Sequence, residues 1–261
     1  YHWLSFMMQP FDWLETGFRY TTINNRLYSE NAPEWSHYQS YLDKSIDFKA
    51  RLLKESDWLP EVAVGMRDVG GTGLFSSEYL AASKRTGRLD WTMGLAWGNM
   101  GSRANIKNPL SSVFGQRFNT RVSDTGLGGT LQTSTWFRGN TAMFAGVEYQ
   151  APQNLVFKLE YDANRYLREP LGNVFEQKSP FNWGVVYRPF KALDITAGLE
   201  RGNTWSVGLT FYTDMANLHM PKLTAPQTPD VQIDRPEENP NWQKTAQDIE
   251  RLTLWDVKQV Y

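Results

Sequence analysis

The chain has 261 residues, and its opposite charges almost cancel, with 27 Lys and Arg against 28 Asp and Glu. This balance leaves no basic surface of the kind that binds nucleic acid, so nucleic acid is not an expected partner. Cysteine is absent, which excludes disulfides, thiolate catalysis and cysteine-ligated metals. The three histidines, His2, His37 and His219, are scattered without metal-binding spacing, so we expect neither a metal nor another cofactor.

The hydropathy of the chain excludes spanning helices but not membrane strands. Mean hydropathy is −0.53, and no run reaches the roughly 18 apolar residues of a spanning helix. Aromatic residues make up 14% of the chain, with 11 Trp and 12 Tyr. A membrane barrel carries its apolar band at alternating positions, which an average over a window does not detect. The composition is therefore compatible with a membrane protein built from strands.

The dominant pattern is a period of two. In Ser45–Leu53, the charged residues Asp47, Lys49 and Arg51 alternate with apolar ones; a strand places all three on one face, whereas a helix would scatter them. The same pattern predicts further strands, and together these are about eleven segments, each about as long as a tilted strand that crosses a bilayer. They are Trp13–Thr22, Leu89–Gly98, Asn154–Asp162, Phe181–Arg188, Leu193–Glu200 and Thr204–Thr213, with weaker candidates at Trp3–Met8, Glu61–Arg67, Ser77–Lys84 and Thr141–Gln150.

The predicted connections alternate between short turns and long loops. Gln9–Asp12 is short, Ile23–Lys44 is long and Asn99–Asn140 is very long, whereas Arg201–Thr204 is tight where a long loop is due. Short turns at one rim and long loops at the other are typical of outer-membrane barrels, whose short turns face the periplasm. The longest loop has the length to fold inward as a plug, and the sequence leaves open whether the lumen is open or filled.

The direction of the strands predicts an even number of strands in the complete barrel. If Gln9–Asp12 is a periplasmic turn, the strand at Trp3–Met8 runs toward the periplasm. Bacterial single-chain barrels have even strand counts, so a further strand that runs outward should precede Trp3–Met8. We therefore expect an all-β fold, an antiparallel transmembrane β-barrel of about twelve strands over residues 1–215, whose first strand is missing from this chain. A proline-rich linker at 216–241 and the start of a small periplasmic α/β domain at 242–261 follow, with a helix at Thr245–Leu252 and a strand at Leu254–Tyr261.

The stretch Arg67–Lys84 contains Gly70, Gly71 and Gly73. A dinucleotide-binding loop needs a further glycine before a helix, and a phosphate-binding loop needs Lys and then Ser or Thr where Leu74 stands. Strands flank this stretch on both sides, so a hairpin loop in which glycine supplies a positive φ explains it better.

Charged residues of both signs recur on the polar strand faces. A glycosidase needs two carboxylates at a set separation, which one sequence cannot show, and we expect no enzyme. Ion pairs and water in a polar lumen account for these charges; the sharper interpretation is a lumen that hydrogen-bonds a polysaccharide. The candidate lumen residues are Glu15, Arg19, Asp47, Lys49, Arg51, Arg67, Glu78, Lys84, Lys158, Glu160, Asp162 and Arg188.

Several long motifs resemble those of a known family. They are "MQPFDWLETGFRYT" (Met8–Thr21), "DKSIDFKARLLKESDWLPEVAVGMRDVGGTGLFSSEYLAASK" (Asp43–Lys84), "LDWTMGLAWGNMGS" (Leu89–Ser102), "FRGNTAMFAGVEYQAP" (Phe137–Pro152) and "LEYDANRY" (Leu159–Tyr166). Through them the chain resembles the YjbH-type (YjbH/GfcD-like) exopolysaccharide and capsule biosynthesis proteins of Gram-negative outer membranes.

The resemblance implies an outer-membrane protein, often a lipoprotein, whose C-terminal segment lies in the periplasm. The expected function is polysaccharide secretion, as conduit or escort for the polymer. The alternative is a plugged scaffold that docks periplasmic export proteins and is not itself a pore. The implied partners are membrane lipids, the exopolysaccharide and other periplasmic or outer-membrane export proteins, and the resemblance supplies no catalytic residues.

Overall fold

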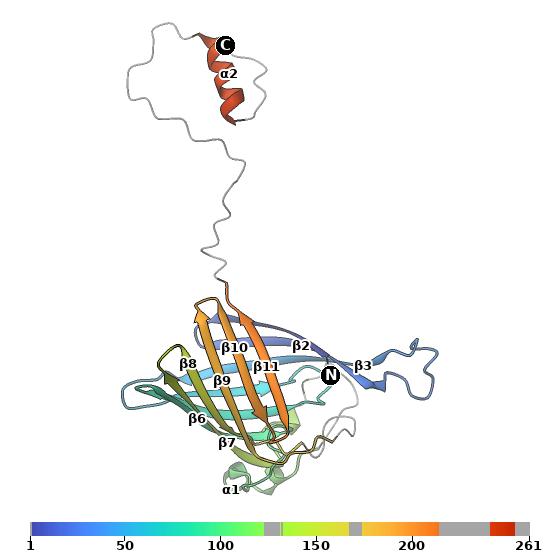
Figure 1. Ribbon diagram of the computed structural model, residues 1–261. Helices are drawn as coiled ribbons and strands as arrows, with labels where there is room; N and C mark the ends of the chain where they lie inside the picture. Colours follow the sequence, from blue (N-terminus) through green and yellow to red (C-terminus); the bar gives the residue numbers. More distant parts are fainter. Residues whose placement is uncertain (1, 123–130, 132, 167–173, 214–240, 254–261) are drawn as a thin grey trace. The chain divides into compact units, whose positions relative to one another are not determined.

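A computed structural model describes residues 2–122, 131, 133–166, 174–213 and 241–253. The chain divides into two units, Tyr1–Tyr212 and Thr213–Tyr261. In the first unit, one sheet contains eleven strands in sequence order (Figure 1). Every neighbouring pair is antiparallel, so the sheet is a continuous series of hairpins.

The eleven strands expected from the alternation are confirmed, with most ends shifted by a few residues. They are β1 (His2–Phe11), β2 (Leu14–Leu27), β3 (Ser40–Leu53), β4 (Glu61–Arg67), β5 (Ser77–Thr86), β6 (Leu89–Gly98), β7 (Thr141–Ala151), β8 (Leu155–Tyr161), β9 (Phe181–Phe190), β10 (Leu193–Glu200) and β11 (Thr204–Phe211).

The register assigns each side chain to one of two faces, because directly opposed residues of paired strands lie on the same side. We call inner the face that carries Gly17, Asp47 and Gly65, and outer the face that carries the intervening residues such as Phe18 and Ile46. The pairs Gly17↔Asp47, Lys49↔Gly65 and Gly65↔Tyr79 carry the inner face across β2, β3, β4 and β5. The close fit of the Tyr79 ring over Gly65 requires glycine there, since a Cβ would lie 2.0 Å from the ring.

The hairpin between β2 and β3 is longer than the sequence indicated. The prediction of a loop over Ile23–Lys44 is wrong at both ends, because the ladder continues through Thr21↔Asp43 and Ile23↔Tyr41. Ile23 is fully buried, which stabilises the extension despite its polar neighbours. The connecting loop is reduced to residues 28–39, and the N–H of Tyr28 donates to the carbonyl of Gln39 across its base at 2.8 Å.

The two outermost strands leave the sheet open. Among the described strands, β1 pairs only with β2, and β11 pairs only with β10. The exposed side chains on these edges include Leu4 on β1 (75%) and Val207 on β11 (80%). Closure into a barrel is therefore not observed in the described sheet.

The segment between β6 and β7 packs around one end of the sheet. It contains α1 (Pro109–Phe114) and two short 3₁₀ helices, η1 (Gln116–Asn119) and η2 (Thr133–Thr135). These helices were not predicted, although Asn108 followed by proline is a recognisable helix start. Asn108 caps α1 by accepting from the N–H of Leu110, and the same side-chain oxygen accepts from Nε1 of Trp97.

A buried ion pair fixes this segment to the outer face. Arg121 donates to both carboxylate oxygens of Glu78, at 2.7 and 3.0 Å. The N–H of Phe137 donates to the same carboxylate at 2.9 Å, and the Glu78 side chain is only 1% exposed. Glu78 is therefore a charged residue on the outer face that its own chain covers.

The second unit contains one described helix, α2 (Trp242–Thr253), which confirms the helix expected at Thr245–Leu252. Asn241 begins it, since its side chain accepts from the N–H of Lys244 at 3.2 Å. The predicted linker up to residue 240 and the predicted strand at 254–261 lie outside the described residues. Neither α1 nor α2 combines the length and the apolar character that a membrane-spanning helix requires.

Replacing Glu78 should loosen the segment between β6 and β7. Glu78→Ala leaves Arg121 without its counter-charge, and breaking a buried pair in this way costs about 3–5 kcal/mol. We expect faster tryptic cleavage after Arg117, Arg121 and Arg138 in the folded protein. Glu148→Ala is the matched control, because its pair with Lys158 is 42% exposed on each side. Equal protease resistance of the two variants would show that the pair does not hold the segment.

Candidate functional site

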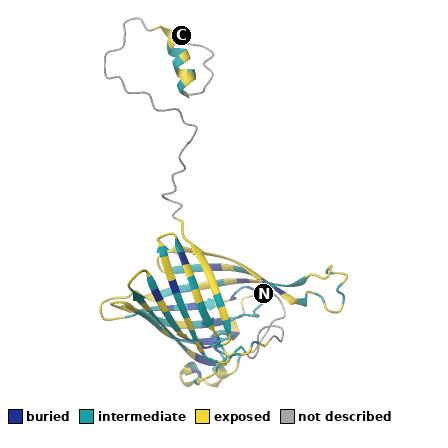
Figure 2. Cartoon of the chain, in the orientation of Figure 1, coloured by how far each residue is buried: buried dark blue, intermediate teal, exposed yellow. Residues whose placement is uncertain are grey.

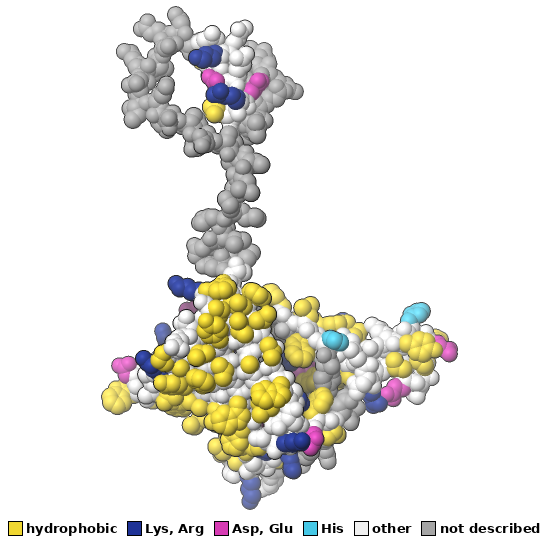
Figure 3. Space-filling model, in the orientation of Figure 1, with side chains coloured by type: hydrophobic (Ala, Val, Ile, Leu, Met, Phe, Trp, Pro, Cys, Tyr) yellow, Lys and Arg dark blue, Asp and Glu magenta, His cyan; other side chains and the backbone are white. Residues whose placement is uncertain are grey.

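The two faces of the sheet differ in chemistry. Outer positions are almost all apolar, as in Phe157 and Leu159 of β8 or Trp205, Val207 and Leu209 of β11. Inner positions are mostly charged, polar or small, with exceptions such as Trp3, Met7 and Ile23. Figure 2 shows the resulting alternation of exposure along β9 and β10, and Figure 3 shows apolar side chains gathered over β9–β11.

Ion pairs between adjacent strands cross-link the inner face. Each joins a cation to a carboxylate on the neighbouring strand, so most of the inner charges neutralise one another locally. The pairs are Arg19–Asp47 (2.6 Å), Lys49–Glu15 (2.9 Å), Arg51–Glu61 (3.6 Å), Arg85–Asp90 (3.2 Å), Lys158–Glu148 (2.6 Å) and Arg188–Asp194 (3.2 Å).

Ten of the twelve candidate lumen residues lie on the inner face or continue it. Glu160 opposes Asn182 and accepts a hydrogen bond from it. Asp162 lies just beyond β8, where its carboxylate accepts from the Tyr166 hydroxyl at 2.6 Å. Contact of any of the ten with a polysaccharide stays a prediction.

The other two candidates lie on the outer face. Tyr79 lies on the inner face, because it is paired with the inner residue Gly65. Glu78 and Lys84 are an odd number of residues away from Tyr79 along β5, so their side chains lie on the opposite face. Lys84 donates to the carbonyl of Ser56 at 2.6 Å, in the turn between β3 and β4. The expectation that all twelve residues share one face does not match this register. In β5, small residues such as Ser and Ala occupy both the odd and the even positions, so its sequence does not show which set of side chains faces inward.

A cavity of about 690 Å³ opens on the inner face. Residues of β1–β4 line one side, and residues that follow β8 and β10 line the other, so the sheet curls enough to bring its two halves to one site. The lining includes Trp3, Ser5, Met7, Arg19, Asp47, Arg67, Phe75, Tyr166, Phe175 and Arg201.

Arg201 is held in the cavity wall by two aromatic rings. Its guanidinium carbon lies 5.3 Å from the ring centre of Tyr166 and 5.1 Å from that of Phe175, within the range of a cation–π contact. Nη2 also donates to the Thr204 hydroxyl at 3.0 Å. Arg201 was not among the sequence candidates; the only signal was that its turn is tight where the loop alternation predicts a long loop.

The glycine-rich stretch forms the predicted loop between β4 and β5, and its anchor is Asp68. The N–H of Asp68 donates to Asp47 at 3.0 Å, and its own carboxylate accepts from the N–H of Phe75 at 2.9 Å. Gly73 has a φ of 77°, as expected for such a loop. A Cβ on Gly71 would lie 2.1 Å from both Asp68 Oδ1 and the carbonyl of Lys44, so only glycine fits there.

The environment of two loop side chains raises their pKa values. Burial raises the pKa of Asp68 to about 7, and the nearby Asp43 carboxylate adds to the effect. Burial also raises the pKa of Tyr166, and its hydrogen bond to Asp162 acts in the same direction. Asp68 Oδ1 is buried without a hydrogen-bond donor, which fits a carboxyl group that holds a proton at neutral pH.

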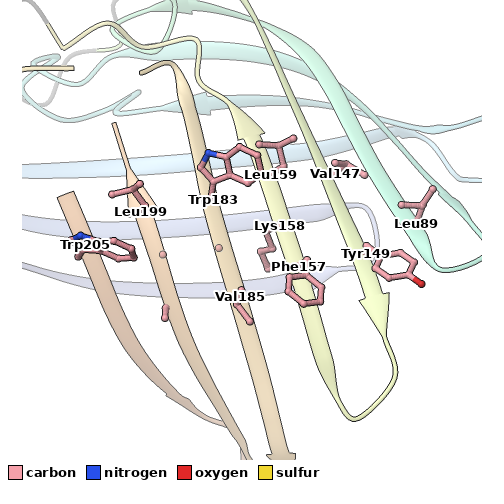
Figure 4. A pocket seen from close by; sticks show the side chains of 13 residues that line it. Leu89, Val147, Tyr149, Phe157, Lys158, Leu159, Trp183, Val185, Leu199 and Trp205 are labelled. Atoms are coloured by element: carbon pink, nitrogen blue, oxygen red, sulfur yellow. The ribbon is translucent and has the colours of Figure 1, made fainter. Parts of the chain in front are cut away.

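A second hollow lies on the outer face and is almost wholly apolar. It has a volume of about 450 Å³, and side chains from β6 to β11 line it (Figure 4). Trp183, Leu159 and Trp205 are among them, and Trp205 is 79% exposed. Exposed apolar area this continuous marks a surface that contacts something apolar.

Neither hollow has the composition of a metal centre. Within the described part of the chain, no group of three or more His, Asp or Glu side chains is placed to hold a metal ion. The inner face can instead donate and accept hydrogen bonds along its length, and its cavity combines guanidinium groups with aromatic rings.

Asp68 should make the stability of the sheet depend on pH. Since its pKa is raised on folding, its stabilising contribution is complete below the unfolded value of 3.8 and is lost as pH rises through about 7. We expect the melting temperature of the wild type to fall between about pH 4 and about pH 7 and to level off above it, and that of Asp68→Asn to fall less over the same range. Asp12→Asn, in the exposed turn after β1, is the control. Parallel pH profiles for all three proteins would contradict this role of Asp68.

Comparisons with known proteins identify the family of this chain. The family model described as "Exopolysaccharide biosynthesis protein YbjH" matches residues 1–261. The "Uncharacterized lipoprotein YjbH" of Escherichia coli (strain K12) is 46% identical over 219 residues, which are 84% of this chain and 31% of that protein. The chain thus spans about a third of that relative's length, and no solved structure matches it. The chain belongs to the YjbH family of exopolysaccharide biosynthesis proteins.

Proposed function

We propose that this protein is an outer-membrane β-barrel that takes part in exopolysaccharide secretion, as conduit or escort for the polymer. The observation that carries the proposal is the two-faced sheet, apolar on the outer face and charged on the inner face. Membership of an exopolysaccharide biosynthesis family suggests that the polymer is an exopolysaccharide. The lipoprotein name of the Escherichia coli relative supports a place in the cell envelope.

The length of the strands supports a membrane location. A strand of ten residues, such as β6, rises about 33 Å, and a tilt of about 40° reduces its height to about 25 Å, the height of the apolar band in such barrels. The outer-face tryptophans, which include Trp91, Trp183 and Trp205, match the aromatic girdles of membrane barrels. Membrane lipid is therefore the proposed partner of the outer face.

The direction of the edge strands supports closure by one further strand. β1 and β11 are both odd-numbered in a series of antiparallel hairpins, so they run in the same direction. A single strand between them would be antiparallel to both and would give the even count of bacterial barrels. We therefore propose a barrel of about twelve strands, from which β11 ends at the rim of short turns, the periplasmic rim.

The inner face supports contact with a hydrated polymer. Its ion pairs leave lysine, arginine and carboxylate groups partly exposed, as in Lys49–Glu15, where the side chains are 37% and 38% exposed. Such groups exchange hydrogen bonds with water and sugar hydroxyls at little cost. We propose no catalytic role for the inner carboxylates, because several of them are committed to these pairs.

The second candidate function is a plugged scaffold that docks export proteins. The helix α2 favours it, because Ala246, Ile249 and Leu252 lie on one side of that helix, and an amphipathic helix commonly packs against a partner. Under this alternative the polymer crosses elsewhere, and the protein recruits the machinery that carries it.

Hydrogen exchange should detect the closing strand in the intact protein. In β1 and β11, alternate amides point away from the neighbouring strand, toward the open edge. If another strand pairs with both edges, these amides will exchange as slowly as those in the centre of β6. Exchange at the rate of loop amides would contradict closure, whereas slow exchange on only one edge would exclude a single bridging strand.

Conductance separates the conduit from the scaffold. The intact protein in planar bilayers should open an ion-conducting pore that the purified cognate polysaccharide blocks, while cells without the protein release less polymer. Bilayers that stay silent, together with lost polymer release, would favour the scaffold. Normal polymer release from cells without the protein would contradict both candidates.

A further inference from the structure

We propose that the inner-face cavity binds a sugar unit that carries a negative charge, so that the polymer handled by this protein is an acidic polysaccharide. The inference rests on the proposed function and deepens it, because it names the class of polymer. It starts from the charge of the cavity lining, which contains three arginines and one aspartate.

The charge of the cavity is not cancelled by its own walls. Arg19 and Asp47 neutralise each other at 2.6 Å, which leaves Arg67 and Arg201. Neither of these arginines takes part in an ion pair within the described parts of the chain, where the paired arginines are Arg19, Arg26, Arg51, Arg85, Arg121, Arg188 and Arg251. The surplus of positive charge predicts an anionic occupant.

Arg67 has donors to offer such an occupant. It is the last residue of β4 and is exposed to solvent on the inner face. Its Nη1 lies 3.7 Å from the sulfur of Met100, and a thioether is a weak acceptor. A guanidinium group in this state can bind a carboxylate or phosphate through two parallel hydrogen bonds.

Arg201 is preorganised for the same purpose. The rings of Tyr166 and Phe175 fix its guanidinium plane, and the N–H groups of Lys178 and Ser179 fix its backbone by donating to its carbonyl at 2.8 and 3.0 Å. Because the side chain is already ordered, an anion that pairs with it causes little further loss of conformational entropy.

The rest of the lining favours a sugar over a simple inorganic anion. Trp3, Phe75, Tyr166 and Phe175 contribute apolar walls, against which the C–H faces of a pyranose ring can pack. The cavity volume of about 690 Å³ lies within the roughly 300–1,000 Å³ of small-molecule sites. The combination of aromatic walls with two arginines therefore fits a hexuronate or another sugar with an acidic substituent.

Binding of defined oligosaccharides tests the inference in the intact, detergent-solubilised protein. The probes are oligogalacturonate, which carries a carboxylate on each unit, and a neutral cello-oligosaccharide of the same length. We expect calorimetry to show binding of the acidic probe only, weakened by added salt. Arg67→Gln should weaken it about tenfold, the effect of losing a hydrogen bond to a charged group.

Three further variants control for folding and for general charge. Arg201→Gln should weaken binding as well. Arg201→Lys keeps the positive charge and should retain part of the affinity, so the two variants together distinguish the effect of the charge from the effect of packing against the aromatic rings. Arg26→Gln is the matched control, since Arg26 pairs with Glu30 at the distal end of the β2–β3 hairpin. Inorganic phosphate serves as a third probe. If phosphate binds as tightly as the acidic oligosaccharide, the cavity is a general anion site and not a sugar site.

The outcomes distinguish this inference from the proposed function. Equal affinity for the acidic and neutral probes, or unchanged affinity in Arg67→Gln and Arg201→Gln, would overturn the proposal that the polymer is acidic. Polymer release in cells would then still decide the proposed function on its own. Binding of neither probe would also overturn the cavity as a site for charged sugars.

Discussion

Each strand can present a side chain to only one of two faces, and the hydrogen-bonded ladder makes that choice common to all eleven strands. A slip of one residue in any pair would move charges to the apolar face and apolar groups to the charged one. The inner ion pairs resist such a slip, because Lys49 and Glu15 are directly opposed in the register and so are Lys158 and Glu148. Register and charge pairing therefore reinforce each other.

The exceptions to the alternation lie at the ends of strands, where the constraint is different. Glu78, Trp97 and Thr141 occupy outer positions, yet each is almost completely buried. The segment between β6 and β7 covers them and supplies Arg121, Asn108 and the backbone of Phe137 as polar partners. An outer position can thus hold a carboxylate where the chain covers it, which would be costly where the surface meets a hydrocarbon phase.

The sequence predicts the strands well and the loops poorly, for a physical reason. An alternation such as that of Leu89–Gly98 follows directly from the two-sided environment of a strand, and it coincides with β6. Long-range contacts leave no comparable local pattern: nothing near Arg201 indicates that it packs against Tyr166 and Phe175. The inner ion pairs were anticipated as a class because their residues alternate locally, but the parity of Glu78 depends on register with β4 and β6, which no local pattern in β5 reveals.

The position of the uncompensated charges follows from the cost of burying them. Most inner charges within the strands are paired with a neighbouring strand, because an isolated ion in a surface of low dielectric constant is strongly disfavoured. Arg67 and Arg201 have no such partner, and they lie at the end of β4 and in the turn before β11. Both sites are at the rim of long loops, where Arg67 is exposed to solvent and the guanidinium of Arg201 packs against two aromatic rings. A lumen whose inner charges are mostly paired along its length, with the two unpaired arginines at one rim, would bind an acidic polymer at that rim without holding it along the whole path.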